Sequence, residues 1–310
     1  MMPLAATGHQ PVMVREVLEA LKVVPGGRYV DATLGGGGHG WAILEASAPG
    51  GQLLGIDVDP GAVATAEARL RPYASSVLLL RENFRYLAPV CHRLGFSPVH
   101  GVLFDLGLSS LQLDEAGRGF SFQEDGPLDM RFDPTQGRTA ADIINTAPLE
   151  ELERILRDYG EEPRHRQIAR AIVASRPLGT TGQLAAAVAR AGDGHFGRRH
   201  PATRTFQAIR IAVNAELENL EEALHQVAEL LGFGGRLVVI SYHSLEDAVV
   251  KGFLRRESQD CLCPPHVMQC LCGHTATFRV IAKKVIRPSP AEVVANPRCR
   301  SARLRVAERL

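Results

Sequence analysis

Apolar positions in the first third of the chain come in short runs that alternate with amphipathic stretches. The runs at 28–32, 52–57, 76–80 and 100–106 have the length and composition of buried strands, and the stretches at 15–23, 41–48 and 61–71 have helical periodicity. Short buried strands separated by helices predict an α/β fold with a doubly wound, mostly parallel sheet.

The alternation stops after Asp105. Residues 113–137 are rich in Gly, Asp, Phe and Pro and show no period, which indicates a long functional loop. Helical stretches follow at 140–145, 149–159, 164–175 and 183–191, the last with Thr180 or Thr181 as its N-cap. We therefore expect a doubly wound domain, residues 1–112 and 206–310, interrupted by a mostly helical insert, residues 113–205.

The sheet pattern resumes in the last third of the chain. One long helix is predicted over 205–231, followed by a strand at 236–241 and by candidate final strands at 277–285 and 302–307.

Composition and charge exclude a few classes of protein. A hydrophobic content of 45% with 22% charged residues is typical of a globular domain, and a net charge of +1 indicates no global basic field. Residues 1–10 lack the features of a signal peptide and no apolar run is long enough to span a membrane, so we expect a cytoplasmic protein with no membrane partner.

Most of the basic residues are arginines, and many of them cluster. Arginine suits phosphate recognition, but a GC-rich genome, which favours Arg over Lys, would give the same clusters on ordinary solvated surfaces, and both interpretations remain open. The clusters are formed by Arg164, Arg166 and Arg170, by Arg198, Arg199 and Arg204, and by Arg298, Arg300, Arg303 and Arg305.

A glycine-rich loop lies between the first predicted strand and the next helix, at residues 31–40 (DATLGGGGHG). Glycines let the backbone approach a ligand closely, and the helix N-terminus offers N–H donors. Asp57 closes the following strand, 22 positions after Gly35, where a carboxylate would accept hydrogen bonds from ribose hydroxyls. The loop and the acid predict an adenosine-containing cofactor.

Two cofactors fit this pattern, because Gly35, Gly37 and Gly40 also match the fingerprint of dinucleotide-binding proteins. Asp31 favours S-adenosylmethionine, since an acid at the end of the first strand suits an ammonium group and not a pyrophosphate. Asp105 ends the fourth strand, where methyltransferases usually hold the acceptor. An NAD-linked dehydrogenase remains the alternative. Such an enzyme needs a proton-transfer group near the nicotinamide, and no feature of the sequence points to one.

Nine further blocks, in order along the chain, resemble the MraW family of methyltransferases. They are residues 9–13 (HQPVM), 31–40 (DATLGGGGHG), 55–60 (GIDVDP), 104–107 (FDLG), 118–122 (RGFSF), 125–131 (DGPLDMR), 159–162 (YGEE), 200–208 (HPATRTFQA) and 241–247 (SYHSLED). Each block alone is weak evidence, but the complete ordered set is specific and covers nearly the whole chain.

The resemblance implies a Rossmann-like S-adenosylmethionine methyltransferase fold with a helical inserted domain. It also implies N4-methylation of a decoding-centre cytidine in 16S rRNA, within the small ribosomal subunit. The cofactor contacts of the family fall on Gly37, Gly38, His39, Asp57, Phe84, Asp105 and Gln112. Tyr242 departs mildly from the family, which often has Phe at this position.

Methylation of an exocyclic amine needs alignment of the reacting atoms and an acceptor for the amine hydrogens. The candidate acceptors are Asp105 and the backbone carbonyls just after it. Alternatively, Asp105 only binds the cofactor. His243, just beyond the predicted strand 236–241, is a second candidate catalytic residue, although most histidines at such turns only satisfy local hydrogen bonds.

Other routes of base methylation lack their signatures. A cytosine-C5 enzyme needs a cysteine nucleophile near the acceptor strand, and none follows Asp105. The Asn-Pro-Pro-aromatic signature associated with adenine-N6 enzymes is also missing. An assembly factor that binds RNA without catalysis is the remaining alternative, which the intact Gly37, Asp57 and Asp105 disfavour.

Four cysteines lie within twelve residues: Cys261, Cys263, Cys270 and Cys272, followed by His274. This spacing is tighter than the usual C-x-x-C of zinc sites and appears only in some relatives, so zinc and a loop of reduced thiols both remain open. No metal site is assigned from the sequence.

Overall fold

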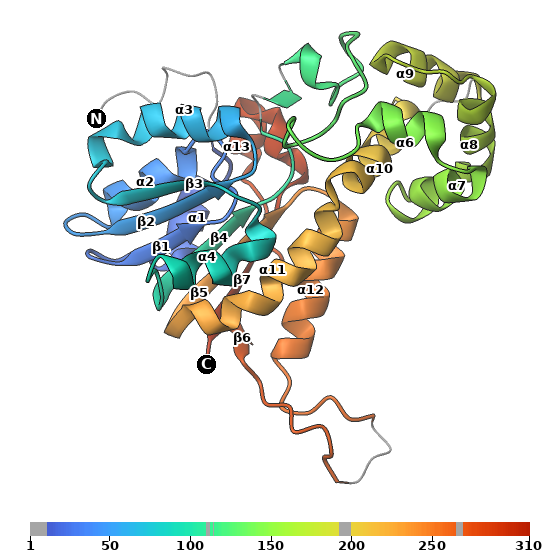
Figure 1. The fold of residues 1–310 in the computed structure, drawn as a ribbon. Helices are drawn as coiled ribbons and strands as arrows, with labels where there is room; N and C mark the ends of the chain where they lie inside the picture. Colours follow the sequence, from blue (N-terminus) through green and yellow to red (C-terminus); the bar gives the residue numbers. More distant parts are fainter. Residues whose placement is uncertain (1–10, 110–111, 114, 192–199, 265–268) are drawn as a thin grey trace. The chain divides into compact units, whose positions relative to one another are not determined.

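The computed structural model describes residues 11–109, 112–113, 115–191, 200–264 and 269–310. The chain forms two compact units (Figure 1). The first, here the sheet unit, comprises Met1–Gly107 and Leu217–Leu310, and the second, here the helical unit, comprises Leu108–Glu216. The sequence placed the limits of the insert at 113 and 205, so the observed helical unit is longer at both ends.

The sheet unit contains a seven-stranded sheet with the order β3-β2-β1-β4-β5-β7-β6. Strands β1 to β5 run parallel to one another, and β7 is antiparallel to both β5 and β6. This is the predicted doubly wound, mostly parallel sheet of the Rossmann-like methyltransferase fold. The strands are β1 (Arg28–Asp31), β2 (Gln52–Asp57), β3 (Val77–Arg81), β4 (Val99–Asp105), β5 (Leu231–Ser241), β6 (Phe278–Val280) and β7 (Arg303–Arg309).

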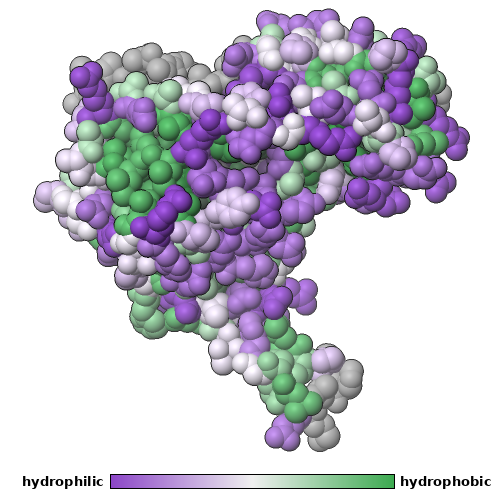
Figure 2. Space-filling view, in the orientation of Figure 1, coloured by the Kyte–Doolittle hydropathy of each residue, from purple (hydrophilic) through white to green (hydrophobic). Residues whose placement is uncertain are grey.

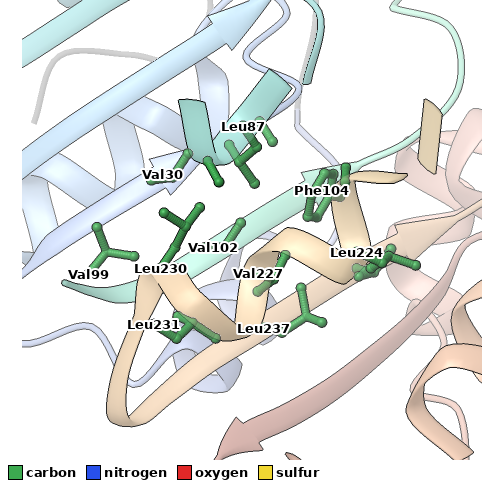
Figure 3. Packing of buried hydrophobic residues seen from close by; sticks show 14 of the residues in the cluster. Val30, Leu87, Val99, Val102, Phe104, Leu224, Val227, Leu230, Leu231 and Leu237 are labelled. Atoms are coloured by element: carbon green, nitrogen blue, oxygen red, sulfur yellow. The ribbon is translucent and has the colours of Figure 1, made fainter. Parts of the chain in front are cut away.

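Helices cover both faces of the sheet, and the side chains of the strands alternate between two cores. Val102 and Phe104 of β4 point into one core, whereas Leu103 between them points into the other. The first core also takes residues from α4 (Leu87–Arg93), α11 (Glu216–Leu230) and α12 (Ser244–Glu257); Figure 3 shows its centre. The second takes residues from α1 (Val14–Leu21), α2 (Gly38–Ala46) and α3 (Pro60–Leu70), and α13 (Pro290–Ala295) contributes a partly buried valine.

The helical unit has a hydrophobic core of its own, built from one apolar face of each helix. Thr139 and Thr180 form capping boxes with Asp142 and Gln183, so Thr180 is the N-cap that the sequence left undecided. The outward surface of this unit is mostly hydrophilic in Figure 2. Its helices are α6 (Ala140–Thr146), α7 (Leu149–Asp158), α8 (His165–Ala174), α9 (Thr181–Arg190) and α10 (Ala202–Asn214).

The single helix predicted over 205–231 is wrong. Ala215 adopts a left-handed conformation with φ 48°, which ends α10 and lets α11 begin at Glu216. The buried side chains of α10 belong to the core of the helical unit, and those of α11 belong to the sheet unit. Because of this break, α10 and α11 can each pack into a different core. No helix in the described ranges is long and apolar enough to cross a bilayer.

Candidate active site

The glycine-rich loop leads from β1 into α2 at the carboxyl edge of the sheet. Gly37 is the N-cap of α2 with φ 75°, and a Cβ there would lie 3.2 Å from the Cβ of Ala66. A left-handed backbone and a close neighbour together require glycine at this position. The first turn of α2 directs N–H groups that have no acceptor within the helix toward the loop, which suits a polar ligand.

Asp57 ends β2 and holds the loop in place. Its Oδ2 accepts a hydrogen bond of 2.8 Å from the Gly35 N–H, and its Oδ1 accepts one of 2.9 Å from the Asp59 N–H. Burial raises the pKa of Asp57 to about 6, although these two backbone donors act in the opposite direction. Each carboxylate oxygen keeps a second lone pair, so the residue can also accept bonds from ribose hydroxyls.

Asp31 ends β1 and is 1% exposed. Its Oδ1 accepts a hydrogen bond of 3.2 Å from the Thr33 N–H, whereas its Oδ2 has no hydrogen-bond partner in the part of the chain that the structure describes. Burial raises the pKa of Asp31 to about 7; the neighbouring Asp105 and Asp57 act in the same direction, whereas His39 and the Thr33 N–H act against it. A buried carboxylate oxygen without a donor indicates that a ligand supplies one.

Three carboxylates therefore end three adjacent strands: Asp31 on β1, Asp57 on β2 and Asp105 on β4. The negative charges of Asp57 and Asp105 each raise the pKa of Asp31. S-adenosylmethionine carries a sulfonium and an ammonium group, so its charges complement this cluster. The pyrophosphate of a dinucleotide is anionic, so Asp31 and Asp105 in their charged forms disfavour the dehydrogenase alternative.

The raised pKa of Asp31 predicts an unusual dependence of stability on pH. Between its ordinary value of 3.8 and about 7, the folded protein keeps a proton that the unfolded chain has released. The contribution of Asp31 to the free energy of unfolding is therefore fully present below about pH 4 and is lost as the pH rises through about 7. Asp31→Asn, which stays neutral, should be more stable than the parent protein at about pH 8, by as much as about 4 kcal/mol.

Urea unfolding without cofactor at about pH 4 and about pH 8 measures this difference. Asp247→Asn is a control for which the opposite effect on stability is expected. Arg305 and Arg303 outweigh the desolvation of Asp247 and lower its pKa. This variant should lose stability at the higher pH. A parent protein and an Asp31→Asn variant with parallel pH profiles would contradict the prediction.

Asp105 lies at the end of β4 beside two further polar side chains. Its Oδ1 accepts a 2.8 Å hydrogen bond from the Tyr242 hydroxyl, and its Oδ2 lies 3.3 Å from Nε2 of His39. His39 is 5% exposed. Burial alone lowers the pKa of this histidine, but the carboxylates of Asp105 and Asp31 outweigh it and the pKa is raised. Oδ1 of Asp105 is thus held by a hydrogen bond, and Oδ2 lies within ion-pair distance of the imidazole.

The sequence missed Tyr242 as a member of this cluster. Asp105 pairs with Ile240 across β4 and β5, which brings the residue just after β5 next to the end of β4. A Cβ on Gly107, whose φ is 92°, would lie 3.3 Å from the Tyr242 ring, so the glycine gives the ring its space. Burial, followed by the neighbouring Asp105, raises the pKa of Tyr242 well above its ordinary range. The hydroxyl therefore stays protonated and donates.

Replacing Tyr242 by phenylalanine should have a modest effect. The variant loses one hydrogen bond to the Asp105 carboxylate while the ring keeps its packing, which corresponds to about 1.5 kcal/mol, the lower end for a bond to a charged group, and hence to a roughly tenfold lower kcat. Steady-state kinetics at saturating cofactor measure the loss, and Tyr73→Phe is a control tyrosine outside the cluster. A loss as large as that of an Asp105 variant would contradict the modest role.

His243 is the N-cap of α12. Its Nδ1 accepts a 3.3 Å hydrogen bond from the Glu246 N–H, and the Glu246 carboxylate accepts bonds from the N–H groups of Tyr242 and His243. This capping box gives the residue a local structural function, and a contact with the substrate stays a prediction.

Phe84 follows β3 in a short 3-10 helix, and its ring packs edge-on against Phe104 with centroids 5.8 Å apart. It is partly buried against the first core of the sheet unit. Gln112 belongs to the helical unit, where its Oε1 accepts a hydrogen bond from the Ser109 N–H. The cofactor contacts expected of these two residues stay predictions.

The arginine clusters separate into different environments. Arg303 and Arg305 bind the carboxylate of Asp247, so these two stabilise the sheet unit itself. Arg204 is exposed on α10. Of the remaining members, Arg198 and Arg199 lie outside the described residues.

The sequence profile of the MraW methylase family matches residues 6–310. "Ribosomal RNA small subunit methyltransferase H" of Dehalococcoides mccartyi is 58% identical over 97% of this chain and 86% of that protein. Proteins of the same name from Thermomicrobium roseum and Carboxydothermus hydrogenoformans are 57% and 49% identical, over 99% and 97% of this chain and 95% and 98% of theirs.

Proposed function

The chain belongs to the MraW methylase family, and we propose that it methylates the N4 amine of a decoding-centre cytidine in 16S rRNA. It is thus a methyltransferase, and its cofactor is S-adenosylmethionine, as the sequence predicts. The observation that carries the proposed substrate is the 58% identity to a small-subunit rRNA methyltransferase over almost the whole chain. The partner is the small ribosomal subunit and the location is the cytoplasm, where subunits assemble.

The residues for the cofactor follow from the carboxyl edge of the sheet. We assign Asp31 to its ammonium group, Asp57 to its ribose hydroxyls, and Gly37, Gly38 and His39 to the backbone cradle between them. Phe84, Asp105 and Gln112 complete the proposed set. S-adenosylmethionine supplies a methyl group on a positively charged sulfur, an excellent electrophile.

The remaining catalytic task concerns the amine. Its lone pair is delocalised into the cytosine ring, so the protein must orient the amine and accept its hydrogens. Asp105 suits this task because the Tyr242 hydroxyl orients its carboxylate through Oδ1 and the His39 ring lies beside Oδ2. We propose that its carboxylate accepts a hydrogen bond from the amine and takes up the proton that the amine releases after methylation. The base must leave its stack to reach this residue.

The environments of the buried cysteines argue against methylation at C5. Cys91 is fully buried in α4, and burial raises the pKa of its thiol to about 12. Cys299 is also buried, and burial raises its pKa. Neither thiol is poised to act as the thiolate nucleophile that a C5 enzyme needs.

The test is methyl transfer from labelled cofactor to small ribosomal subunits from cells that lack the enzyme, followed by mass analysis of nucleosides. We expect the label in N4-methylcytidine, and none with the Asp57→Ala variant. Label in another nucleoside would refute the proposed acceptor atom. No label on assembled subunits, naked rRNA or assembly intermediates would favour an RNA-binding assembly factor instead.

A further inference from the structure

The segment between α12 and β6 leaves the sheet and returns to it (Figure 1). Its base is tied by backbone and side-chain bonds: the Thr277 N–H donates to the Glu257 carbonyl at 2.9 Å, and the Thr277 hydroxyl donates to the Glu257 carboxylate at 2.7 Å. Farther out, the Ala276 N–H donates to Asp260 at 3.3 Å. These contacts fix only the start and the end of the segment.

The outer part of the segment lacks a hydrophobic core. Among its described residues, 258–264 and 269–277, none is buried, and Leu271 is 81% exposed. Figure 2 shows apolar residues gathered on the surface of this projection. A short segment of this kind needs a cross-link or a metal to hold one conformation.

The outer part nevertheless brings four thiols together. The sulfur atoms of this group, here the four-cysteine cluster, all lie within 4.8 Å of one another. The Sγ–Sγ separations include 3.4 Å for Cys261–Cys270, 3.6 Å for Cys270–Cys272 and 3.9 Å for Cys261–Cys272. Cys263 is the fourth member.

These separations match a tetrahedral metal site. Zn–S bonds of about 2.3 Å at tetrahedral angles place the sulfurs about 3.8 Å apart. A disulfide would require about 2.05 Å, and all four cysteines are free thiols. The pairing of two C-x-C turns supplies two ligands from each side of the segment.

Backbone N–H groups also point at the sulfurs. Leu262 donates to the sulfur of Cys272 at 3.3 Å, and Leu271 donates to the sulfur of Cys263 at 3.3 Å. Each turn thus donates to a sulfur of the other turn. Such bonds stabilise the negative charge that a thiolate carries when it binds a metal.

We propose that the four-cysteine cluster binds one Zn²⁺ as a structural site. Four protein ligands leave no open position for a reacting water, so the site has no catalytic function. On binding, the thiols lose their protons to solvent and four Zn–S bonds form. His274 is not a ligand, because its Nε2 lies 3.2 Å from the carbonyl oxygen of Arg256 and outside the cluster.

The first experiment measures zinc in the full-length protein, purified under reducing conditions and without chelator, by elemental mass spectrometry. We expect about one zinc per chain. Cys270→Ser should lower the zinc content by roughly tenfold or more, since it removes one of four ligands. Leu271→Ser is the matched control, because it changes the exposed neighbour and keeps all four thiols. Its zinc content should equal that of the parent.

A second measurement keeps the proposal testable if a variant is unstable. Cobalt added to the chelator-treated parent should give the intense d–d absorption of a tetrahedral thiolate site, and chelation should speed proteolytic cleavage between residues 258 and 277. The proposal is overturned if the parent stays metal-free after addition of zinc. It is equally overturned if thiol titration finds the four cysteines oxidised, or if Cys270→Ser retains its zinc.

Discussion

Asp105→Asn is expected to lower the kcat of methyl transfer by about 10²- to 10⁴-fold, the usual contribution of a positioned proton acceptor. The amide keeps the shape of the carboxylate but replaces one acceptor oxygen with an NH₂ donor. That donor would face either the hydroxyl of Tyr242 or the ring of His39, both of which now lie beside an oxygen. The variant therefore loses the proton acceptor and also disturbs the groups that orient it.

Single-turnover kinetics at saturating cofactor, together with calorimetry of cofactor binding, separate the two roles proposed for Asp105. We expect the large loss in the rate and a change in cofactor Kd of less than roughly tenfold. Glu82→Gln, the corresponding acid-to-amide exchange just after strand β3, is the control for a general charge effect. A normal rate at saturating cofactor with a much weaker Kd would assign Asp105 to cofactor binding alone.

Asp57→Ala is expected to weaken the binding of S-adenosylmethionine by about 100-fold or more. Hydrogen bonds from two ribose hydroxyls to a carboxylate contribute about 1.5–3 kcal/mol each, and the variant loses both. It also releases the Gly35 N–H, which Asp57 now binds at 2.8 Å, so the glycine loop loses its anchor.

Calorimetric titration at a pH of about 8 tests this, with Asp59→Asn as the matched control. Asparagine caps a helix as well as aspartate does, so that variant should keep α3 and bind cofactor nearly normally. Because the pKa of Asp57 is about 6, the parent should lose affinity as the pH falls through about 6, when the carboxylate takes up a proton. A Kd of Asp57→Ala within threefold of the parent would refute the assignment.

Much of the site could be predicted because parallel strands bring their carboxyl ends to one edge. Asp31, Asp57 and Asp105 each end a strand that the apolar pattern identified, so the fold class places all three at one edge of the sheet, although it does not give the order of the strands that makes them neighbours. Tyr242 could not be found in this way. Its contact with Asp105 depends on the order of strands in the sheet and on the space that Gly107 leaves, and neither is visible in local periodicity.

Two other features could be recognised only in the tertiary structure. Alanine is the best helix former, so nothing local marks Ala215 as the end of α10; the break follows from the burial of the flanking helices in different cores. The cysteine spacing left zinc open because C-x-C pairs are unusual. Only the folded segment places the four sulfurs at separations that suit one metal ion.

The position of the helical unit in the chain has a consequence for synthesis on the ribosome. Strands β1 to β4 are contiguous in sequence, but β4 pairs with β5 only after residues 108–216 have been made. The helical unit has a hydrophobic core of its own and should fold as a unit, while the edge of β4 that pairs with β5 waits for its partner. A chain that ends before residue 231 and has left the ribosome should therefore protect the helical unit from protease and leave the edge of β4 that faces β5 unpaired, a state open to aggregation.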